Sequence, residues 1–289
     1  MSRPFRWQVS RREQLGSLAD AEPHFARPDS GFITSLRKAS ARILAMSDGA
    51  DIAFIGRTPE NFFDYLSGVF EGVAGAPTLH LVQFSLRWPG LDGVKAIPEA
   101  QLAGIFDYFE AEGVSAAQIA AGERPLALVD FVARGGTMES VVSLLHLQAE
   151  RTGTDWKSVQ RRLTIIGLRQ RTKNSPNTWR WQQHAQWLGL IPDARILNVS
   201  AEMGFLIMLA NYQPKTTQSH SPERWAAPER GAPPTVPDET REAMAFAVQV
   251  FDAGNAREER FALAGEIARQ QQMRQPATRA LVSRLKGLG

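Results

Sequence analysis

The sequence contains no cysteine, which excludes disulfide bonds, thiolate zinc sites, iron–sulfur clusters and a cysteine nucleophile. This absence fits the reducing cytoplasm, where we expect the protein to reside. Histidine is scarce as well, and its few positions show no metal-binding spacing: His24, His80, His146, His184 and His220. The sequence also lacks a GxSxG nucleophile elbow, a Walker phosphate loop and a GxGxxG dinucleotide fingerprint, so it offers no hydrolase or Rossmann signature.

Long apolar runs are missing too. The most apolar stretch, residues 203–212, is too short to span a bilayer. The first residues, MSRPFRWQVSRREQ, are polar and basic and lack the apolar core of a signal peptide. The formal net charge is only +3, from 33 basic and 30 acidic residues. That small excess permits an anionic ligand but does not by itself indicate nucleic acid, and we expect no membrane contact.

What the sequence does contain is an alternation of apolar runs and helical periodicities, in a chain of 289 residues that can bury a large core. Because the apolar runs do not alternate with polar residues, they predict strands buried on both faces. The sequence therefore predicts an α/β fold with a mainly parallel sheet flanked by helices and a C-terminal helical extension. We divide it into an irregular arm (1–30), the α/β domain (31–212), a linker or surface arm with six prolines (213–237) and a helical extension (238–289).

The expected elements follow from periodicity and from capping residues. Thr58 is the expected N-cap of a helix whose first residue is Pro59 and which ends near Leu66, before Gly68. A tryptophan-rich helix and a buried helix are expected at about 178–190 and 203–212. Strands are expected at 52–55, 79–86, 126–129, 163–166 and 194–200, further helices at 32–46, 98–112 and 137–150, and a loop at 87–97.

The stretch LALVDFVARGGTMES (126–140) carries the strongest functional signal. An apolar strand ends in Asp130, and a loop with two glycines leads into a helix near Thr137. The first turn of a helix offers unpaired N–H donors and a positive dipole end, and glycine lets the backbone approach an anion closely. Asp130 suits sugar hydroxyls or a Mg²⁺ shell. Ligands bind at the carboxyl ends of parallel strands, so this loop and the loop at 56–58 are expected at one edge.

Residues 129–137 resemble the PRPP-binding motif of the type I phosphoribosyltransferases. The family pattern is an apolar strand, two adjacent acids, a few small or apolar residues and a loop such as Thr-Gly-Gly-Thr. Asp130 falls on the second acid, whereas Val129 stands where the family has the first. The resemblance implies the type I phosphoribosyltransferase fold, PRPP or a ribose-5-phosphate compound as donor, Mg²⁺ as cofactor, and transfer at the anomeric carbon. The acceptor is not identified.

The resemblance also implies a role for each loop. The segment from Arg134 to Thr137 would hold the 5′-phosphate, and Asp130 would contact the ribose hydroxyls as the catalytic-site acid. No side-chain cluster is evident for direct metal binding, so Mg²⁺ would arrive with the ligand, with Asp130 as one contact. The remaining assignments are Gly135 and Gly136 for the 5′-phosphate, Gly56, Arg57 and Thr58 for pyrophosphate, and Arg87 and Lys95 on a mobile loop (87–97) that closes over pyrophosphate.

Two other interpretations stay open. The missing acid at Val129 favours a non-catalytic nucleotide-binding or regulatory module on the same fold. The segment 169–181 mixes cations and aromatic residues as nucleic-acid surfaces do, which suggests a basic nucleic-acid-binding protein. The tryptophans at 179, 181 and 187 either stack a base or belong to the core. The expected partner is a small phosphorylated sugar or nucleotide, and a homodimer is compatible with the sequence.

Overall fold

The structure is a computed structural model that describes residues 28–84, 86–88, 90–171, 181–183, 185–192, 195–216, 225 and 238–287. In this part of the chain five strands form one parallel sheet in the order β2-β1-β3-β4-β5. The predicted α/β fold is therefore confirmed. The strands are β1 (Asp51–Ile55), β2 (Leu79–Val82), β3 (Leu126–Phe131), β4 (Leu163–Gln170) and β5 (Ile196–Ala201).

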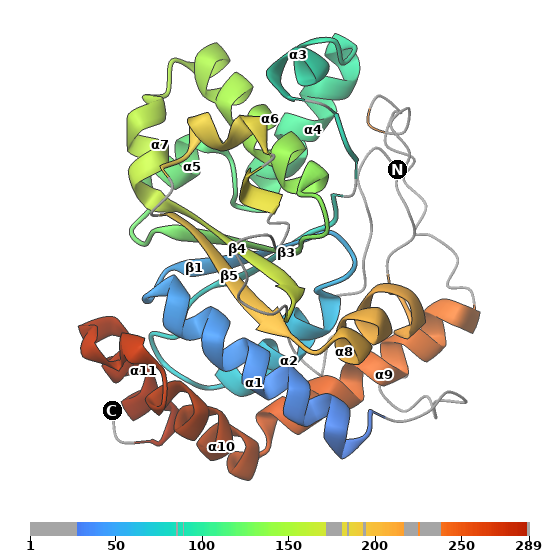
Figure 1. Cartoon of the computed structure of the whole chain (residues 1–289), viewed down its shortest axis with the longest axis vertical. Coiled ribbons are helices and arrows are strands. Elements are labelled where there is room, and N and C mark those ends of the chain that lie inside the picture. Colours follow the sequence, from blue (N-terminus) through green and yellow to red (C-terminus); the bar gives the residue numbers. More distant parts are fainter. Residues whose placement is uncertain are drawn as a thin grey trace.

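Helices cover both faces of the sheet (Figure 1). One layer holds α1 (Ser30–Ser47), α2 (Glu60–Phe70), α8 (Met203–Ile207), α9 (Asp238–Asn255), α10 (Arg257–Ala268) and α11 (Pro276–Leu285). The other holds α3 (Gly90–Lys95), α4 (Glu99–Ala111), α5 (Ala116–Ala121), α6 (Gly136–Thr152) and α7 (Trp156–Arg162). Shorter turns are the 3-10 segments η2 (Trp181–Gln183), η3 (Gln186–Leu190) and η7 (Gln271–Arg274), and the π-helical η5 (Met208–Tyr212).

The apolar strands have side chains in two separate cores. In β3, Ala127 and Val129 pack with α1 and α2, whereas Leu126 and Leu128 pack with α4 and α6. A strand that is buried on both faces must be apolar at successive positions, which explains the continuous apolar run in the sequence. Asp130 continues the series of Leu126 and Leu128, so its side chain lies on the α6 side of the sheet.

Several expected boundaries were wrong. β2 ends at Val82 rather than Leu86, because Gly56 and Phe84 both donate their N–H groups to the Val82 carbonyl, at 2.7 and 2.8 Å. The expected loop 87–97 contains α3, which packs on α6. The described part of the expected tryptophan-rich helix forms only the short turns η2 and η3.

The start and end of α2 also differ from the prediction. Pro59 occupies the cap position and Glu60 begins the helix, so Thr58 is not the N-cap. Gly68 does not end the helix, which continues to Phe70. A Cβ at Gly68 would lie 2.0 Å from the Phe251 carbonyl oxygen of α9, and one at Gly254 of α9 would lie 2.2 Å from the Tyr65 oxygen. The two glycines therefore let α2 and α9 meet backbone to backbone.

The C-terminal helices belong to the same layer as α1 and α2. α9 packs on α2 and α10 packs on α1. Phe246 and Val250 of α9, with Leu263 of α10, are buried in the core that contains α1 and α2. The described part of the expected extension thus completes the cover of one face. Residues 1–27 of the expected N-terminal arm lie outside the described residues, and so does most of the segment 213–237.

The expected buried helix 203–212 is only partly buried. Phe205, Leu206 and Leu209 face the core, whereas the side chains of Met203 and Ile207 are 42% and 40% exposed. Among the described helices none is long and apolar enough to cross a membrane.

Candidate functional site

The strand order brings the two predicted loops to one edge of the sheet. β1 and β3 are parallel neighbours with Phe54 opposite Val129, so the same register places Ile55 beside Asp130. After β1 the chain continues to β2 on one side of this pair, and after β3 it continues to β4 on the other side. The loops after β1 and β3 therefore diverge, and such a switch point is where open α/β sheets bind ligands.

The loop after β3 presents free backbone donors at the start of α6. Gly135 has a positive φ of 85°, and the helix begins at Gly136. The first intrahelical bond runs from Glu139 N to the Gly135 carbonyl at 2.9 Å. Within the described residues, no group accepts a hydrogen bond from the N–H groups of Gly136, Thr137 and Met138. Three donors at the positive end of a long helix are suited to an anion.

Trp181 explains why this loop needs glycine. A Cβ at Gly135 would lie 3.0 Å from Cε3 of Trp181, and a Cβ at Gly167 of β4 would lie 3.4 Å from its Cζ2. The indole is buried and donates from Nε1 to Asn198 Oδ1 at 2.8 Å. The side chain of Trp181 therefore packs between the loop after β3 and the strands β4 and β5, and it fixes the position of the loop. Sequence reasoning did not identify this contact.

Asp130 is a buried acid next to this loop. Asp130 is only 8% exposed, and its Oδ1 accepts a hydrogen bond from the Phe131 N–H at 2.6 Å. Burial raises its pKa to about 8, although the Phe131 hydrogen bond and the positive charge of Arg87 both lower that pKa. The carboxyl group is therefore mainly protonated at pH 7 and becomes an anion most readily when a cation binds nearby.

This raised pKa predicts an unusual pH dependence of stability. In the unfolded chain Asp130 has the ordinary pKa of 3.8, so the folded state binds the proton more tightly. The stability that this group contributes is complete below pH 3.8. It is lost progressively as the pH rises from 3.8 through about 8. We expect the unfolding free energy of the wild type to fall by up to about 1.4 kcal/mol per pH unit relative to Asp130→Asn.

Urea denaturation of both proteins at pH 5, 6 and 7 measures this difference. Parallel pH profiles for the wild type and Asp130→Asn would show that Asp130 titrates normally in the folded state.

Of the two predicted basic residues between β2 and α4, Arg87 reaches the site. Its Cδ lies 3.5 Å from the position of a Cβ at Gly136, and its charge acts on Asp130. Lys95 instead pairs with Glu150, in the last turns of α6, at 3.6 Å. The segment is held on α6 by Ser140, whose Oγ accepts the Trp88 N–H at 2.6 Å. Arg134 is exposed on the loop itself.

The loop after β1 is also tightly held. Gly56 has a positive φ of 80°, and a Cβ there would lie 3.2 Å from the Phe84 carbonyl oxygen. Arg57 and Thr58 are half-buried. Gln213 and Lys215 hydrogen-bond to this loop from a distant part of the sequence. Nothing local in the sequence indicates these contacts.

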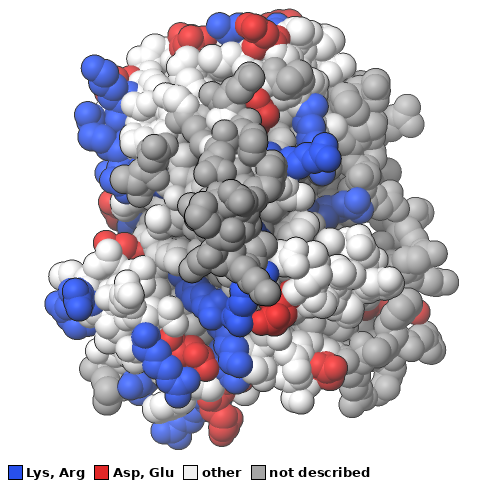
Figure 2. All heavy atoms as spheres, viewed as in Figure 1, with Lys and Arg blue, Asp and Glu red and all other residues white. Residues whose placement is uncertain are grey.

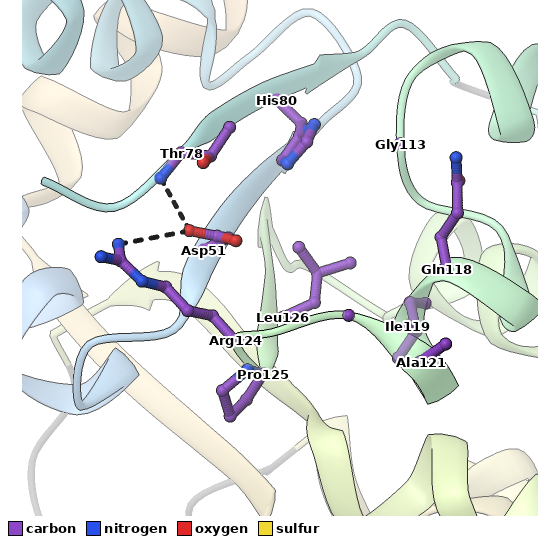
Figure 3. A pocket seen from close by; sticks show the side chains of 11 residues that line it. Asp51, Thr78, His80, Gly113, Gln118, Ile119, Ala121, Arg124, Pro125 and Leu126 are labelled. Carbon is purple, nitrogen blue, oxygen red and sulfur yellow. Dashed lines mark hydrogen bonds and ion pairs between the residues drawn. The ribbon is translucent and has the colours of Figure 1, made fainter. Parts of the chain in front are cut away.

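A cavity of about 400 Å³ lies at the opposite edge of the sheet, near the amino ends of β1, β2 and β3 (Figure 3). Its polar side chains hold the strand ends together. Asp51 accepts the Thr78 N–H at 2.7 Å and pairs with Arg124 at 3.6 Å. Nδ1 of His80 is hydrogen-bonded to the Glu112 carbonyl oxygen at 2.7 Å. This cavity contains no residue of the two predicted loops.

On the face seen in Figure 2, the charged side chains of the described residues do not form a patch of one sign. Lys and Arg side chains lie over the lower left and along the upper left edge of this face, with acidic side chains among them. Most of the predicted basic segment 169–181 lies outside the described residues, and Arg171 pairs with Glu202 at 3.0 Å. Trp181 and Trp187 are core residues stacked on each other with ring centroids 5.9 Å apart. Trp179 lies outside the described residues.

The described residues do not fit a metal site made by the protein alone. Nowhere in the described ranges do three or more His, Cys, Asp or Glu side chains gather closely enough to hold a metal ion. At the candidate site Asp130 supplies a single carboxyl group. A divalent cation at this edge would therefore need the oxygens of a ligand as well.

Comparison with known proteins identifies no relative of this chain. No protein-family model, no curated protein and no solved structure matches the chain significantly. Function must therefore be argued from the site itself.

Proposed function

We propose that the carboxyl edge between β1 and β3 binds PRPP or a related ribose-5-phosphate compound. The observation that carries this proposal is the group of three N–H donors at Gly136, Thr137 and Met138, which have no acceptor among the described residues and lie next to Asp130 and Arg87. The donors suit a 5′-phosphate, because N–H groups at a helix start bind phosphate without a lysine. Asp130, at the end of β3 just before the loop, would contact the ribose hydroxyls.

The pyrophosphate group is assigned to the loop after β1. Gly56 and Thr58 follow β1, the neighbour of β3, and Arg57 adds a positive charge at the same edge. Transfer from PRPP passes through an oxocarbenium-like state while pyrophosphate leaves, and the site must stabilise the charge that develops on that group. Mg²⁺ bound with the ligand would neutralise part of this charge. The residues themselves bind and orient, and no covalent nucleophile is required.

A non-catalytic module is the second candidate, and one observation favours it. Val129, at the position of the first acid of the motif, is completely buried in the apolar core with Phe54 and Phe62. It offers no ligand to ribose or metal. A site with one acid instead of two would bind the sugar phosphate but stabilise the reacting sugar less well.

Calorimetric titration of PRPP with Mg²⁺ tests the proposal. We expect the wild type to bind, and Arg87→Met to bind about tenfold more weakly, because a charge-assisted hydrogen bond is lost. Arg161→Met is the matched control, since Arg161 is exposed near the end of α7 and its partner is Asp155 at 3.8 Å. Equal affinities for wild type and Arg87→Met would remove Arg87 from the site.

Pyrophosphate release divides the two candidates. Incubating the wild type with PRPP, Mg²⁺ and a panel of nucleobases should release pyrophosphate if the protein is a transferase. Tight PRPP binding without release would support the regulatory module instead. Absence of PRPP binding would refute both.

A further inference from the structure

Residues 213–216, which follow η5, lie against the loop after β1 and donate three hydrogen bonds to its backbone carbonyls. Gln213 Nε2 donates to the carbonyl oxygens of Arg57 and Thr58, at 3.1 and 3.0 Å. Lys215 Nζ donates to the Arg57 oxygen at 3.2 Å and to the Leu209 oxygen at 2.5 Å. We call residues 213–216 the strap. One amide and one ammonium group thus bind two successive carbonyls of the proposed pyrophosphate loop.

The strap is anchored on a buried acid. Thr216 donates from its backbone N and its Oγ1 to Oε2 of Glu60, at 3.1 and 2.9 Å. Gln83 Nε2 donates to Oε1 of the same carboxyl group at 3.3 Å. Glu60 and Thr216 are 0% and 5% exposed. Because a buried carboxylate without partners is strongly unfavourable, these contacts fix the position of the strap.

Trp225, the next described residue, packs on the opposite layer. Its ring centroid lies 5.3 Å from that of Tyr108 and 6.3 Å from that of Phe84. A Cβ at Gly104 of α4 would lie only 2.0 Å from the Trp225 carbonyl oxygen. The described residues after η5 thus contact the loop after β1, the segment after β2, and α4.

The strap determines the direction of an N–H group. The Arg57 carbonyl oxygen accepts from Gln213, from Lys215 and, at 3.5 Å, from the Glu60 N–H. In a trans peptide the C=O and N–H point in opposite directions, so holding the Arg57 carbonyl turns the Thr58 N–H away from the strap. No described residue accepts a hydrogen bond from that N–H. It is therefore left for a ligand.

We propose that Gln213 and Lys215 are positioning residues that hold the loop after β1 in its pyrophosphate-binding conformation. This inference rests on the proposed function, and it deepens it by assigning the rigidity of one subsite to a segment of the chain outside both sequence motifs. Neither side chain needs to touch the reacting atoms. Their effect passes through the Arg57–Thr58 peptide.

The charges around Lys215 give the proposal a pH signature. Burial lowers its pKa to about 8, the charge of Arg57 lowers that pKa as well, and Glu60 opposes both effects. A bound anion would offset the repulsion between Arg57 and Lys215 and would raise the pKa. Pyrophosphate binding near pH 8 should then take up a proton, and the pyrophosphate affinity should fall as the pH rises above about 8.

The test compares two ligands that occupy different subsites. Pyrophosphate with Mg²⁺ and ribose 5-phosphate are titrated separately into the wild type, Lys215→Met and the exposed control Lys157→Met. We expect Lys215→Met to weaken pyrophosphate binding about tenfold, as the loss of a charge-assisted hydrogen bond predicts, and to lose proton uptake at pH 8. Ribose 5-phosphate binding should stay unchanged in all three proteins.

Each other outcome is decisive. Equal weakening of both ligands in Lys215→Met would show a general structural defect and would overturn the positioning role, as would unchanged pyrophosphate affinity. If Lys215→Met does not fold, Gln213→Leu, which removes both amide hydrogen bonds, is expected to give the same selective loss. A wild type that binds ribose 5-phosphate but not pyrophosphate would refute this inference and the pyrophosphate assignment, and would leave the phosphate site at the start of α6 standing. A wild type that binds neither compound would refute the proposed function.

Discussion

Gly136→Glu is expected to abolish the binding of ribose 5-phosphate and PRPP while leaving the fold at least as stable. A Cβ at Gly136 would meet its nearest neighbour, Arg87 Cδ, at 3.5 Å, which is an ordinary contact. An acid in the first helical turn interacts favourably with the helix dipole, by about 0.3–1 kcal/mol. The same carboxylate would stand where the phosphate is proposed to bind. Two charges about 4 Å apart near a protein surface repel by about 4 kcal/mol, so affinity should fall by more than 100-fold.

Calorimetry with ribose 5-phosphate and a thermal melt measure the two effects together. Ala100→Glu is the matched control, because Ala100 is an exposed residue in the first turn of α4 and the substitution adds the same charge. It should leave the affinity unchanged. A Gly136→Glu protein that melts normally and still binds ribose 5-phosphate would show that the phosphate does not lie on the α6 N-terminus.

Gly68→Ala is expected to destabilise the protein by about 3 kcal/mol, near the upper end for an overpacked core. The added methyl group would lie 2.0 Å from the Phe251 carbonyl oxygen, and backbone cannot rotate aside as a side chain can. α2 and α9 would have to separate, and both carry side chains of the same core. Gly254→Ala should have a similar effect, since its methyl group would lie 2.2 Å from the Tyr65 oxygen.

Gly265→Ala is the control for this experiment. Gly265 lies inside α10, and apart from the backbone of α10 no atom of the described residues lies within 4 Å of a Cβ built there. Alanine is a better helix former than glycine, so this variant should be more stable than wild type by up to about 1 kcal/mol. Urea denaturation of the variants gives the comparison. If Gly68→Ala and Gly265→Ala behave alike, the backbone contact between α2 and α9 is looser than described.

Local signals in the sequence predicted the parts of the site that are local. The strand before Asp130, the glycines at 135 and 136 and the helix after them are consecutive, so composition and spacing were enough to place them together. The continuous apolar strands predicted the parallel sheet, and the parallel sheet placed the loops after β1 and β3 at one edge. The fold class and the meeting of the two loops therefore followed from short stretches of sequence and one general rule.

The rest depends on contacts between distant residues. Gly68 was taken for a helix end because glycine both stops helices and permits close packing, and only the position of α9 distinguishes the two. Lys95 faces Glu150 because α3 docks on α6, which nothing in the segment 87–97 indicates. The contacts of Gln213 and Trp181 join residues that no periodicity connects. Burial of Asp130, and hence its raised pKa, likewise requires the assembled structure.

The strap has a consequence for how the protein is made. Lys215 and Arg57 are 158 positions apart, so a growing chain has β1 and its loop long before the groups that hold them exist. On the ribosome the sheet can begin to assemble, but the proposed pyrophosphate loop lacks the hydrogen bonds of the strap until residue 216 has left the exit tunnel. We therefore expect nascent chains that stop before residue 213 to lack affinity for pyrophosphate even where their strands have paired.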